Sequence, residues 1–248
     1  MRYLLKLTYD GTAYRGWQIQ PNAPTVQGVL NDVLALILGA PIETTGCGRT
    51  DAGVHASVFY AHFDAEDVIS EKFIPRANFL LPMDIRVHEV YAVSSNFNAR
   101  FDAMSRSYEY VVNFSQNPFI AKYALFLSKK PDFAVMNKAA QKLMEYDSFA
   151  SFSKTGTDHK TMFCKITKAE WREYEHDIWK FHITSDRFLR GMVRAIVGTL
   201  LDLGWDKIKE HDVVKIIESN DRSKAGESVA AHGLFLSDVT YHKIINQR

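Results

Sequence analysis

The most informative stretch of the sequence is Gly48-Arg-Thr-Asp-Ala-Gly-Val-His-Ala56, which places one carboxylate, Asp51, two residues after a permanent cation, Arg49. The glycines in and just before this stretch allow backbone conformations that other residues avoid, so we expect a loop that aims Asp51 outward. An arginine beside an aspartate favours the ionised carboxylate, which suits a nucleophile or charge stabiliser rather than a general acid. Asp and Gly also form ordinary turns, and this window alone leaves both interpretations open.

The composition is that of a folded chain. Of its 248 residues, 46% are hydrophobic and 12% aromatic, which argues against disorder. No apolar run approaches the length of a membrane span, and the alternating pattern at the N-terminus leaves no room for a signal peptide. The cysteines Cys47 and Cys164 show neither a disulfide framework nor metal-ligand spacing. We therefore expect a cytoplasmic protein without a membrane partner.

The net charge of only +1 means that binding to a polyanion would depend on local basic clusters. The candidate clusters are Arg15; Lys129 with Lys130; Lys154 with His159 and Lys160; Arg187, Arg190 and Arg194; and Arg222 with Lys224. Clusters of this size are also common on ordinary solvated surfaces, so they do not identify a function.

Hydrophobic periodicity predicts a mixture of strands and helices. In the first half we expect strands over 3–9, 57–63 and 85–93, a helix over 26–37 between an N-cap at Thr25 and Gly39, and a short helix over 69–80. In the second half we expect strands over 107–114, 166–174, 179–185 and 234–241, and helices over 133–146, 189–203 and 211–219. This order favours an α+β fold, with sub-domains over 1–104 and 105–248 that share a continuous sheet and form a cleft.

Motifs of several other enzyme classes do not occur. Asp51 stands where a dinucleotide fingerprint beginning at Gly46 needs its third glycine, and a carboxylate there would repel a pyrophosphate. There is no phosphate-loop lysine motif, no His-Glu-x-x-His and no Gly-x-Ser-x-Gly. A glycosidase would need a second carboxylate opposite Asp51, and no acid is singled out for that role.

Three further segments carry groups suited to RNA. The segment Asp10–Gln20 contains Tyr14, Arg15, Trp17 and Gln18, which can stack on bases and form hydrogen bonds to RNA. Arg106-Ser-Tyr108-Glu-Tyr110 opens an expected strand, where cross-strand packing is the favoured role of Tyr110. Arg187, Arg190 and Arg194 lie on or near one face of the expected apolar helix, as a phosphate grip or as a solvated helix edge.

Taken together, the segments resemble the tRNA pseudouridine synthase A family. The resemblance runs nearly end to end in the family's order, through Tyr9-Asp-Gly-Thr-Ala-Tyr-Arg-Gly-Trp-Gln-Ile-Gln20, Thr25-Val-Gln-Gly28, Gly48–Ala56, Phe97-Asn-Ala-Arg-Phe101, Arg106–Tyr110, Asp147-Ser-Phe-Ala-Ser-Phe152, Phe188-Leu-Arg-Gly-Met-Val-Arg194 and Gly233-Leu-Phe-Leu236. Two departures occur. Val229-Ala230-Ala231 lacks the family's usual proline, and Asp186-Arg187 replaces a small polar residue and glycine.

The resemblance implies two ferredoxin-like α/β sub-domains that share a mostly antiparallel sheet with a central cleft. It implies a homodimer, without metal or organic cofactor, that converts uridine to pseudouridine at positions 38 to 40 of the tRNA anticodon stem-loop. Asp51 would be the catalytic nucleophile and Tyr108, Arg49 and Arg194 would bind the substrate. The candidate RNA contacts are Tyr14, Arg15, Trp17, Gln18, Arg106 and Arg190. The preferred uridine and the choice of tRNAs stay open.

The reaction breaks the N1–C1′ bond, turns the uracil and joins C5 to C1′ without net oxidation or reduction. Asp51 could attack C1′ or draw a proton from C2′, and the sequence does not choose between these routes. The target nucleotide should leave the base stack before reacting. A non-catalytic RNA-binding module and a retaining glycosidase are the alternative functions.

Overall fold

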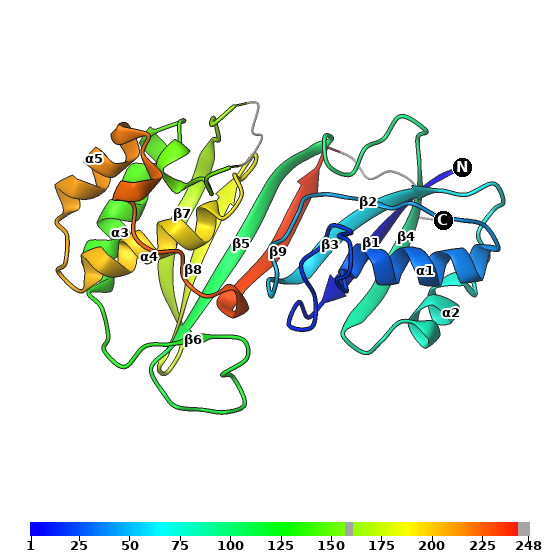
Figure 1. Cartoon of the computed structure of the whole chain (residues 1–248), viewed down its shortest axis with the longest axis horizontal. Coiled ribbons are helices and arrows are strands. Elements are labelled where there is room, and N and C mark those ends of the chain that lie inside the picture. Colours follow the sequence, from blue (N-terminus) through cyan, green and yellow to red (C-terminus); the bar gives the residue numbers. More distant parts are fainter. Residues whose placement is uncertain (157–160, 243–248) are drawn as a thin grey trace. The chain divides into compact units, whose positions relative to one another are not determined.

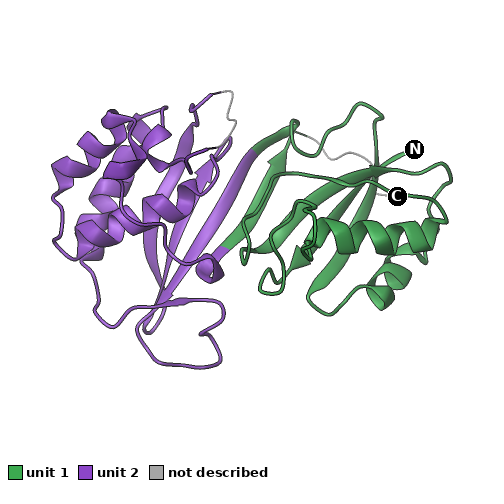
Figure 2. Cartoon of the chain, in the orientation of Figure 1, with its two compact units in different colours: residues 1–104, 235–248 green, residues 105–234 purple. Residues whose placement is uncertain are grey.

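The computed structural model describes residues 1–156 and 161–242, so His159 and Lys160 of the candidate basic clusters lie outside the described residues. The chain divides into two compact units (Figure 2). Unit 1 comprises Met1–Met104 together with the segment from Phe235 onward, and unit 2 comprises Ser105–Leu234. The expected division also lies at residue 104, but the closing strand was expected in the second part and belongs to unit 1 instead.

Unit 1 is built on four neighbouring strands in the order β4-β1-β3-β9 (Figure 1). Their bounds are β1 Arg2–Tyr9, β3 His55–Asp64, β4 Ile85–Val93 and β9 Leu234–Tyr241, and the short β2, Thr45–Gly46, pairs with β3. The pairs β1–β3 and β1–β4 are antiparallel. The pair β3–β9 is parallel, with His55 opposite Phe235 and Ala56 opposite Leu236. The last strand of the chain thus lies beside the strand that follows the Asp51 loop.

Two helices complete unit 1: α1, Val26–Leu38, and α2, Phe73–Leu80. Helix α1 begins where expected, because the Thr25 hydroxyl accepts a hydrogen bond from the Gly28 N–H at 3.2 Å. It ends at Gly39, whose φ of 72° is the left-handed conformation that glycine adopts without strain. Its buried face carries Val26, Leu30 and Leu34.

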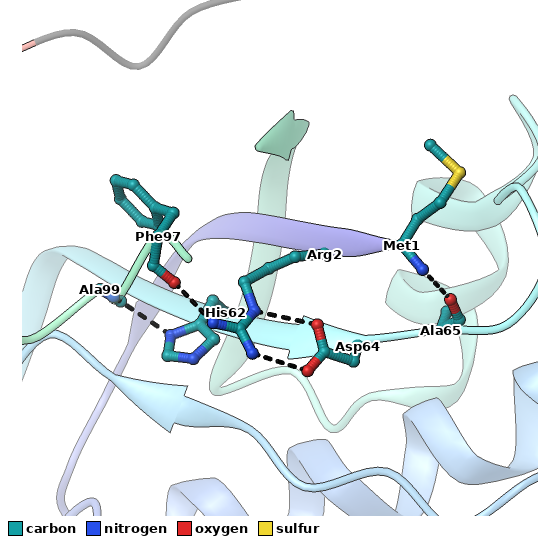
Figure 3. Close-up of polar contacts among 7 residues, drawn as sticks. All are labelled: Met1, Arg2, His62, Asp64, Ala65, Phe97 and Ala99. Carbon is teal, nitrogen blue, oxygen red and sulfur yellow. Dashed lines mark hydrogen bonds and ion pairs between the residues drawn. The ribbon is translucent and has the colours of Figure 1, made fainter. Parts of the chain in front are cut away.

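The far end of β3 is tied to the connector between β4 and β5, as Figure 3 shows. The Arg2 guanidinium donates two hydrogen bonds to the Asp64 carboxylate, at 2.9 and 2.7 Å, and a third to the Phe97 carbonyl at 2.9 Å. His62 Nδ1 accepts a hydrogen bond from the Ala99 N–H at 3.1 Å. These contacts fix the Phe97–Phe101 motif to the sheet of unit 1.

Unit 2 contains β5, Ala103–Asn113, which begins just inside unit 1, and the antiparallel pairs β5–β8 and β8–β7. Strands β7 and β8 span Ile166–Glu175 and Ile178–Ser185, and the short β6, Leu125–Phe126, pairs with β5. The helices are α3 Phe133–Lys142, α4 Met192–Gly204 and α5 Glu210–Ser219, with 3-10 turns at Leu143–Glu145, Ala150–Phe152, Arg222–Lys224 and Ala231–Gly233.

Aromatic rings and the apolar helix α4 form the core of unit 2. Phe133 of α3 stacks on Trp179 of β8 with ring centroids 3.7 Å apart, and Trp171 packs against both Phe133 and Phe181. Ten of the thirteen residues of α4 are buried, as expected for its apolar composition. Together with unit 1, this arrangement confirms a mixed α+β fold with mostly antiparallel strand pairs.

Several bounds and elements differ from those expected: α2 begins at Phe73 rather than at residue 69, and α3 ends at Lys142 rather than at residue 146. Helix α4 begins at Met192, not at residue 189, after Gly191 in the left-handed conformation (φ 72°). The two-residue strands β2 and β6 were not expected, because two residues carry no periodic signal. In the described part of the chain, no helix combines the length and apolar character needed to cross a bilayer.

Candidate active site

Asp51 lies on a tight turn between β2 and β3, where its side chain is half-buried. The Val54 N–H donates to the Asp51 carbonyl at 3.1 Å, which closes the turn. Gly53 stands inside it with φ 76°, a conformation that favours glycine. The expected turn is therefore present, and Gly53 is the glycine whose φ it requires. We call Asp51–Val54 the Asp51 turn.

A second segment, Tyr14–Trp17, holds the Asp51 turn through its backbone. The Gly53 N–H donates to the Tyr14 carbonyl at 3.2 Å, and the Trp17 N–H donates to the Thr50 carbonyl at 3.3 Å. Between these bonds Gly16, with φ 90°, packs directly against the Asp51 turn. A β-carbon on Gly16 would lie 2.4 Å from the Thr50 carbonyl oxygen and 3.1 Å from the Asp51 carbonyl carbon. Only glycine fits this contact without displacement.

The Asp51 turn also rests on buried side chains. The hydroxyls of Tyr9 and Thr50 are 2.8 Å apart and hydrogen-bonded. Trp17 is only 1% exposed and stacks on Phe59 of β3 with ring centroids 4.2 Å apart. Gly46 lies against the same indole, since a β-carbon there would approach two Trp17 ring atoms to 2.7 Å. The backbone around Asp51 is thus built on a packed aromatic core.

Two of the predicted RNA contacts are part of that core. Trp17 is buried as described, and Tyr14 is 7% exposed. The Tyr14 hydroxyl donates to Asp84 Oδ1 at 2.6 Å, and burial together with this bond raises the pKa of Tyr14. Neither ring has the open face that stacking on a base requires. A mixture of aromatic and basic residues is typical of RNA-binding segments and of cores alike, so the pattern did not separate them.

The other two residues predicted from this segment lie nearer to solvent. Arg15 is exposed, and its backbone is fixed by bonds to Pro24 and Gln20 at 2.9 Å each. Gln18 is half-buried and donates to Gln27 Oε1 at 2.9 Å. Arg15 therefore keeps an exposed guanidinium, whereas the Gln18 amide is engaged within the protein.

Arg49 does not hold Asp51 in this structure. Its side chain is exposed, and none of the described residues forms an ion pair or hydrogen bond with it. Residues two apart on a bent loop need not face one another, which is why adjacency in sequence was a poor guide. Asp51 has interactions of its own.

Unit 2 places the predicted tyrosines on β5. Tyr108 is half-buried, and its ring meets the edge of Phe188 at 5.1 Å and 90°. Tyr110 is fully buried and its hydroxyl donates to the Ala230 carbonyl at 2.8 Å, while burial raises its pKa. The favoured packing role of Tyr110 is confirmed. A half-buried aromatic ring such as that of Tyr108 can present an apolar face to a ligand.

The predicted arginines of unit 2 do not share a helix face. Arg187 and Arg190 precede α4, and only Arg194 lies within it. Arg194 is half-buried and its Nε donates to the Val229 carbonyl at 2.6 Å. Arg106, on β5, donates to the Asp186 carbonyl at 2.8 Å, while Arg190 is exposed. Arg106 and Arg194 thus anchor to the two segments in which the sequence departs from the family.

The Asp186 carboxylate, at one of the two departures, has hydrogen-bond partners within the protein. Its Oδ1 accepts hydrogen bonds from the backbone N–H groups of Lys165 and Arg187, at 2.8 and 2.7 Å, and from the Ser185 hydroxyl at 3.1 Å. Asp186 therefore organises the turn that leads from β8 toward α4. Across the described residues, no group of three or more His, Cys, Asp or Glu side chains is arranged to hold a metal ion.

Several residues that shape the site were not singled out as site residues. Gly16 and His55 lie within quoted motifs, but their roles depend on packing between distant segments. Gln27 is 4% exposed; its Nε2 donates to the Thr44 carbonyl at 2.6 Å and its Oε1 accepts from the Ile19 N–H at 2.9 Å. A polar residue inside an otherwise apolar helix face was the available signal for Gln27.

Comparisons with known proteins agree with the motif order. A family model described as tRNA pseudouridine synthase matches residues 139–242. Proteins named tRNA pseudouridine synthase A from Parabacteroides distasonis and Bacteroides fragilis are each 48% identical to the chain, over 97% of it and 96% of their own length. One from Caldicellulosiruptor saccharolyticus is 40% identical, over 96% of the chain and 98% of its own length.

Proposed function

Since the chain belongs to the tRNA pseudouridine synthase A family and is an isomerase that makes pseudouridine in tRNA, we propose that Asp51 is its nucleophile and that it acts at positions 38 to 40 of the anticodon stem-loop. The observation that carries the proposal is the Asp51 turn itself. A half-buried carboxylate on a turn held by backbone bonds to Tyr14 and Trp17 is already fixed before substrate binds.

The bond changes can be written without a cofactor. An Asp51 oxygen attacks C1′ as the N1–C1′ bond breaks, and the uracil leaves with that electron pair. The uracil turns, C5 attacks C1′, and the C1′–Asp51 bond breaks. The C5 proton is then lost and N1 takes up a proton, which restores the conjugated ring of the base with no net change in protons. The other route, in which Asp51 first draws a proton from C2′, uses the same carboxylate and gives the same product.

The substrate has to bring its base out of the stack to reach a carboxylate on a folded protein surface. We assign Tyr108 to contact the extruded uracil, which its half-buried ring supports. Arg49 and Arg194 are assigned to substrate binding, and the exposure of Arg49 supports contact with phosphate. Arg15, Arg106 and Arg190 remain candidates for contacts elsewhere on the RNA. We also propose a homodimer and a cytoplasmic location, and both of these proposals rest on the family resemblance.

The decisive experiment compares Asp51→Asn with wild type on unmodified tRNA. The amide keeps the shape of the side chain but removes its negative charge and its nucleophilic oxygen. We expect at least a thousandfold loss of pseudouridine formation in a single turnover, with the tRNA dissociation constant within about threefold of wild type. Mapping the product by sequencing of carbodiimide-treated tRNA tests positions 38 to 40 in the same reaction.

The matched control is Asp206→Asn, which makes the same chemical change at a side chain that is 79% exposed. It should leave both rate and affinity unchanged. Turnover by Asp51→Asn at the control's rate would refute Asp51 as the nucleophile, and pseudouridine mapped only outside positions 38 to 40 would refute the proposed target. Binding without any product in the wild-type protein would favour a non-catalytic RNA-binding module.

A further inference from the structure

His55 is a buried histidine placed four residues after Asp51, at the start of β3. The residue is 1% exposed, and its ring stacks on Phe235 of β9 with centroids 4.6 Å apart and planes 23° apart. A phenylalanine could make the same stacking contact without burying polar nitrogen atoms, which lose hydration on burial. The presence of histidine at this position therefore indicates that its ring nitrogens form polar contacts.

The Nδ1 atom of His55 meets the turn that follows β1. It is 3.0 Å from the Gly11 backbone nitrogen and 3.0 Å from Asp10 Oδ1. One nitrogen serves these two partners in different protonation states: as a bare acceptor it takes the Gly11 N–H bond, and as an N–H it donates to Asp10. In one state the imidazole is held by Gly11 and in the other by Asp10, so the ring is tied to this turn in either case.

That turn is packed against the chain between Asp51 and His55. A β-carbon on Gly11 would lie 2.0 Å from the Val54 carbonyl oxygen, so the two backbones are in direct contact. The carboxylate of Asp10 also accepts hydrogen bonds from the backbone N–H and hydroxyl of Thr12, at 2.9 and 2.6 Å, which rigidify the turn. His55 is thus joined to a rigid element.

The same element continues into the segment that holds the Asp51 turn. The Tyr14 N–H donates to the Gly11 carbonyl at 3.0 Å, and the Tyr14 carbonyl in turn accepts from the Gly53 N–H at 3.2 Å. The contacts form a closed circuit: His55 holds Gly11, Gly11 sets Tyr14, Tyr14 holds Gly53, and the backbone from Gly53 leads back to His55. Asp51 stands at the edge of this circuit.

We propose that His55 is a positioning residue for Asp51, acting through the hydrogen bond of its Nδ1 to the Asp10–Gly11 turn. The proposal rests on Asp51 being the catalytic carboxylate. It assigns no contact with substrate to His55. The imidazole holds the Asp10–Gly11 turn, and that turn helps to hold the Asp51 carboxylate in place. Loss of the imidazole should therefore lower the rate of the chemical step more than the affinity for tRNA. Misplacement of a reacting group by about 1 Å can cost a hundredfold in rate.

Two substitutions separate the polar and the packing roles of the ring. His55→Phe keeps an aromatic ring against Phe235 but has no nitrogen for Gly11. His55→Asn loses the ring but places an amide near the position of Nδ1. For each variant we would measure the single-turnover rate with unmodified tRNA, the tRNA dissociation constant and the thermal midpoint.

The proposal predicts that the two variants rank in opposite orders for rate and for thermal midpoint: His55→Asn should be the faster enzyme, and His55→Phe should be at least as stable. His55→Phe should form pseudouridine about 30- to 100-fold more slowly than wild type while its tRNA dissociation constant stays within about twofold. His55→Asn should recover at least tenfold of that loss, and so lie within tenfold of the wild-type rate, despite a thermal midpoint at or below that of His55→Phe. A purely structural histidine would give rates that follow the thermal midpoints, and a wild-type rate for His55→Phe would overturn the proposal.

The same assay distinguishes this failure from failure of the proposed function. If Asp51→Asn is inactive and His55→Phe is fully active, Asp51 stands and the positioning role falls. If Asp51→Asn is active, the assignment of the nucleophile falls, and with it the role proposed for His55. Should His55→Phe fail to fold, as judged by circular dichroism, a folded His55→Asn with less than a tenth of the wild-type rate would overturn the proposal, and one within tenfold would support it.

Discussion

Gly16 lies so close to Thr50 that a β-carbon on it would come within 2.4 Å of the Thr50 carbonyl oxygen. We expect Gly16→Ala to push the Asp51 turn away and to lower the single-turnover rate about tenfold or more. The φ of 90° adds backbone strain for alanine, of about 1–3 kcal/mol, so the thermal midpoint should also fall by several degrees.

Gly39→Ala is the matched control for Gly16→Ala. Gly39 also has positive φ, 72°, but a β-carbon there would meet nothing within 4 Å. Gly39→Ala should therefore report the backbone strain alone: the free energy of unfolding should fall by about 1 kcal/mol while the activity stays normal. Equal losses of activity in the two variants would show that the contact with Thr50 does not matter for catalysis.

Arg15→Ala should change the affinity for tRNA, whereas Tyr14→Phe should change only the stability of the fold. The exposed Arg15 guanidinium can reach phosphate, so its removal should weaken tRNA binding and reduce the slope of log K against log salt by about one. Tyr14→Phe removes only the bond to Asp84, so it should cost about 1–2 kcal/mol of stability and leave the salt slope unchanged. The reverse pattern would restore Tyr14 as the RNA contact.

The stability of the protein should fall in mild acid through His62. Burial, reinforced by the charge of Arg2, lowers the pKa of His62 below its ordinary value of 6.5. Below pH 6.5 the unfolded chain therefore binds a proton that the folded chain refuses, and the free energy of unfolding falls as pH decreases. One proton gives at most about 1.4 kcal/mol per pH unit.

His62→Asn keeps an acceptor for the Ala99 N–H but does not titrate (Figure 3). Urea unfolding at pH 7.5 and 5.5 should show a smaller loss of stability in this variant than in wild type. His176→Asn, at a side chain that is 93% exposed, should keep the wild-type loss. Parallel pH profiles for all three proteins would exclude His62 as the source.

Both cysteines should resist thiol reagents in the folded protein. Cys47 is 0% exposed and Cys164 is 2% exposed, and burial raises the pKa of Cys164 to about 12. The thiolate is the reactive form, so labelling at pH 8 should be at least a hundredfold slower than in urea, where two thiols should react. Rapid reaction of a native thiol would show that one of these sites opens readily.

Periodicity and capping chemistry predicted most of the elements of both units, because those signals are local. Thr25 marks a boundary through its side-chain hydroxyl, and Gly39 and Asp177 (φ 64°) do so through their left-handed backbone, so each signal lies in a single residue. The family motifs in turn led to the proposed roles of Asp51 and Tyr108, which stay predictions. Sequence could not show that Trp17 is buried, since an indole in a glycine-rich segment suits a core and an RNA surface equally well.

The features that hold Asp51 could not be read from local sequence. Gly16 and Gly11 are needed because distant backbones come into contact with them, and His55 is held by the turn after β1. Such contacts have no periodicity and no fixed spacing. The missing pair between Arg49 and Asp51 has the same cause, since loop geometry rather than adjacency decides which side chains meet.

Unit 1 cannot be completed until β9 has been synthesised, because β9 follows unit 2 in the sequence. Phe235 of β9 is the stacking partner of His55, yet it is made only after the whole of unit 2. A ribosome therefore delivers the Asp51 turn long before β9, and the sheet beside that turn stays one strand short until β9 has emerged. Chains that stop before β9 should for this reason be unable to modify tRNA.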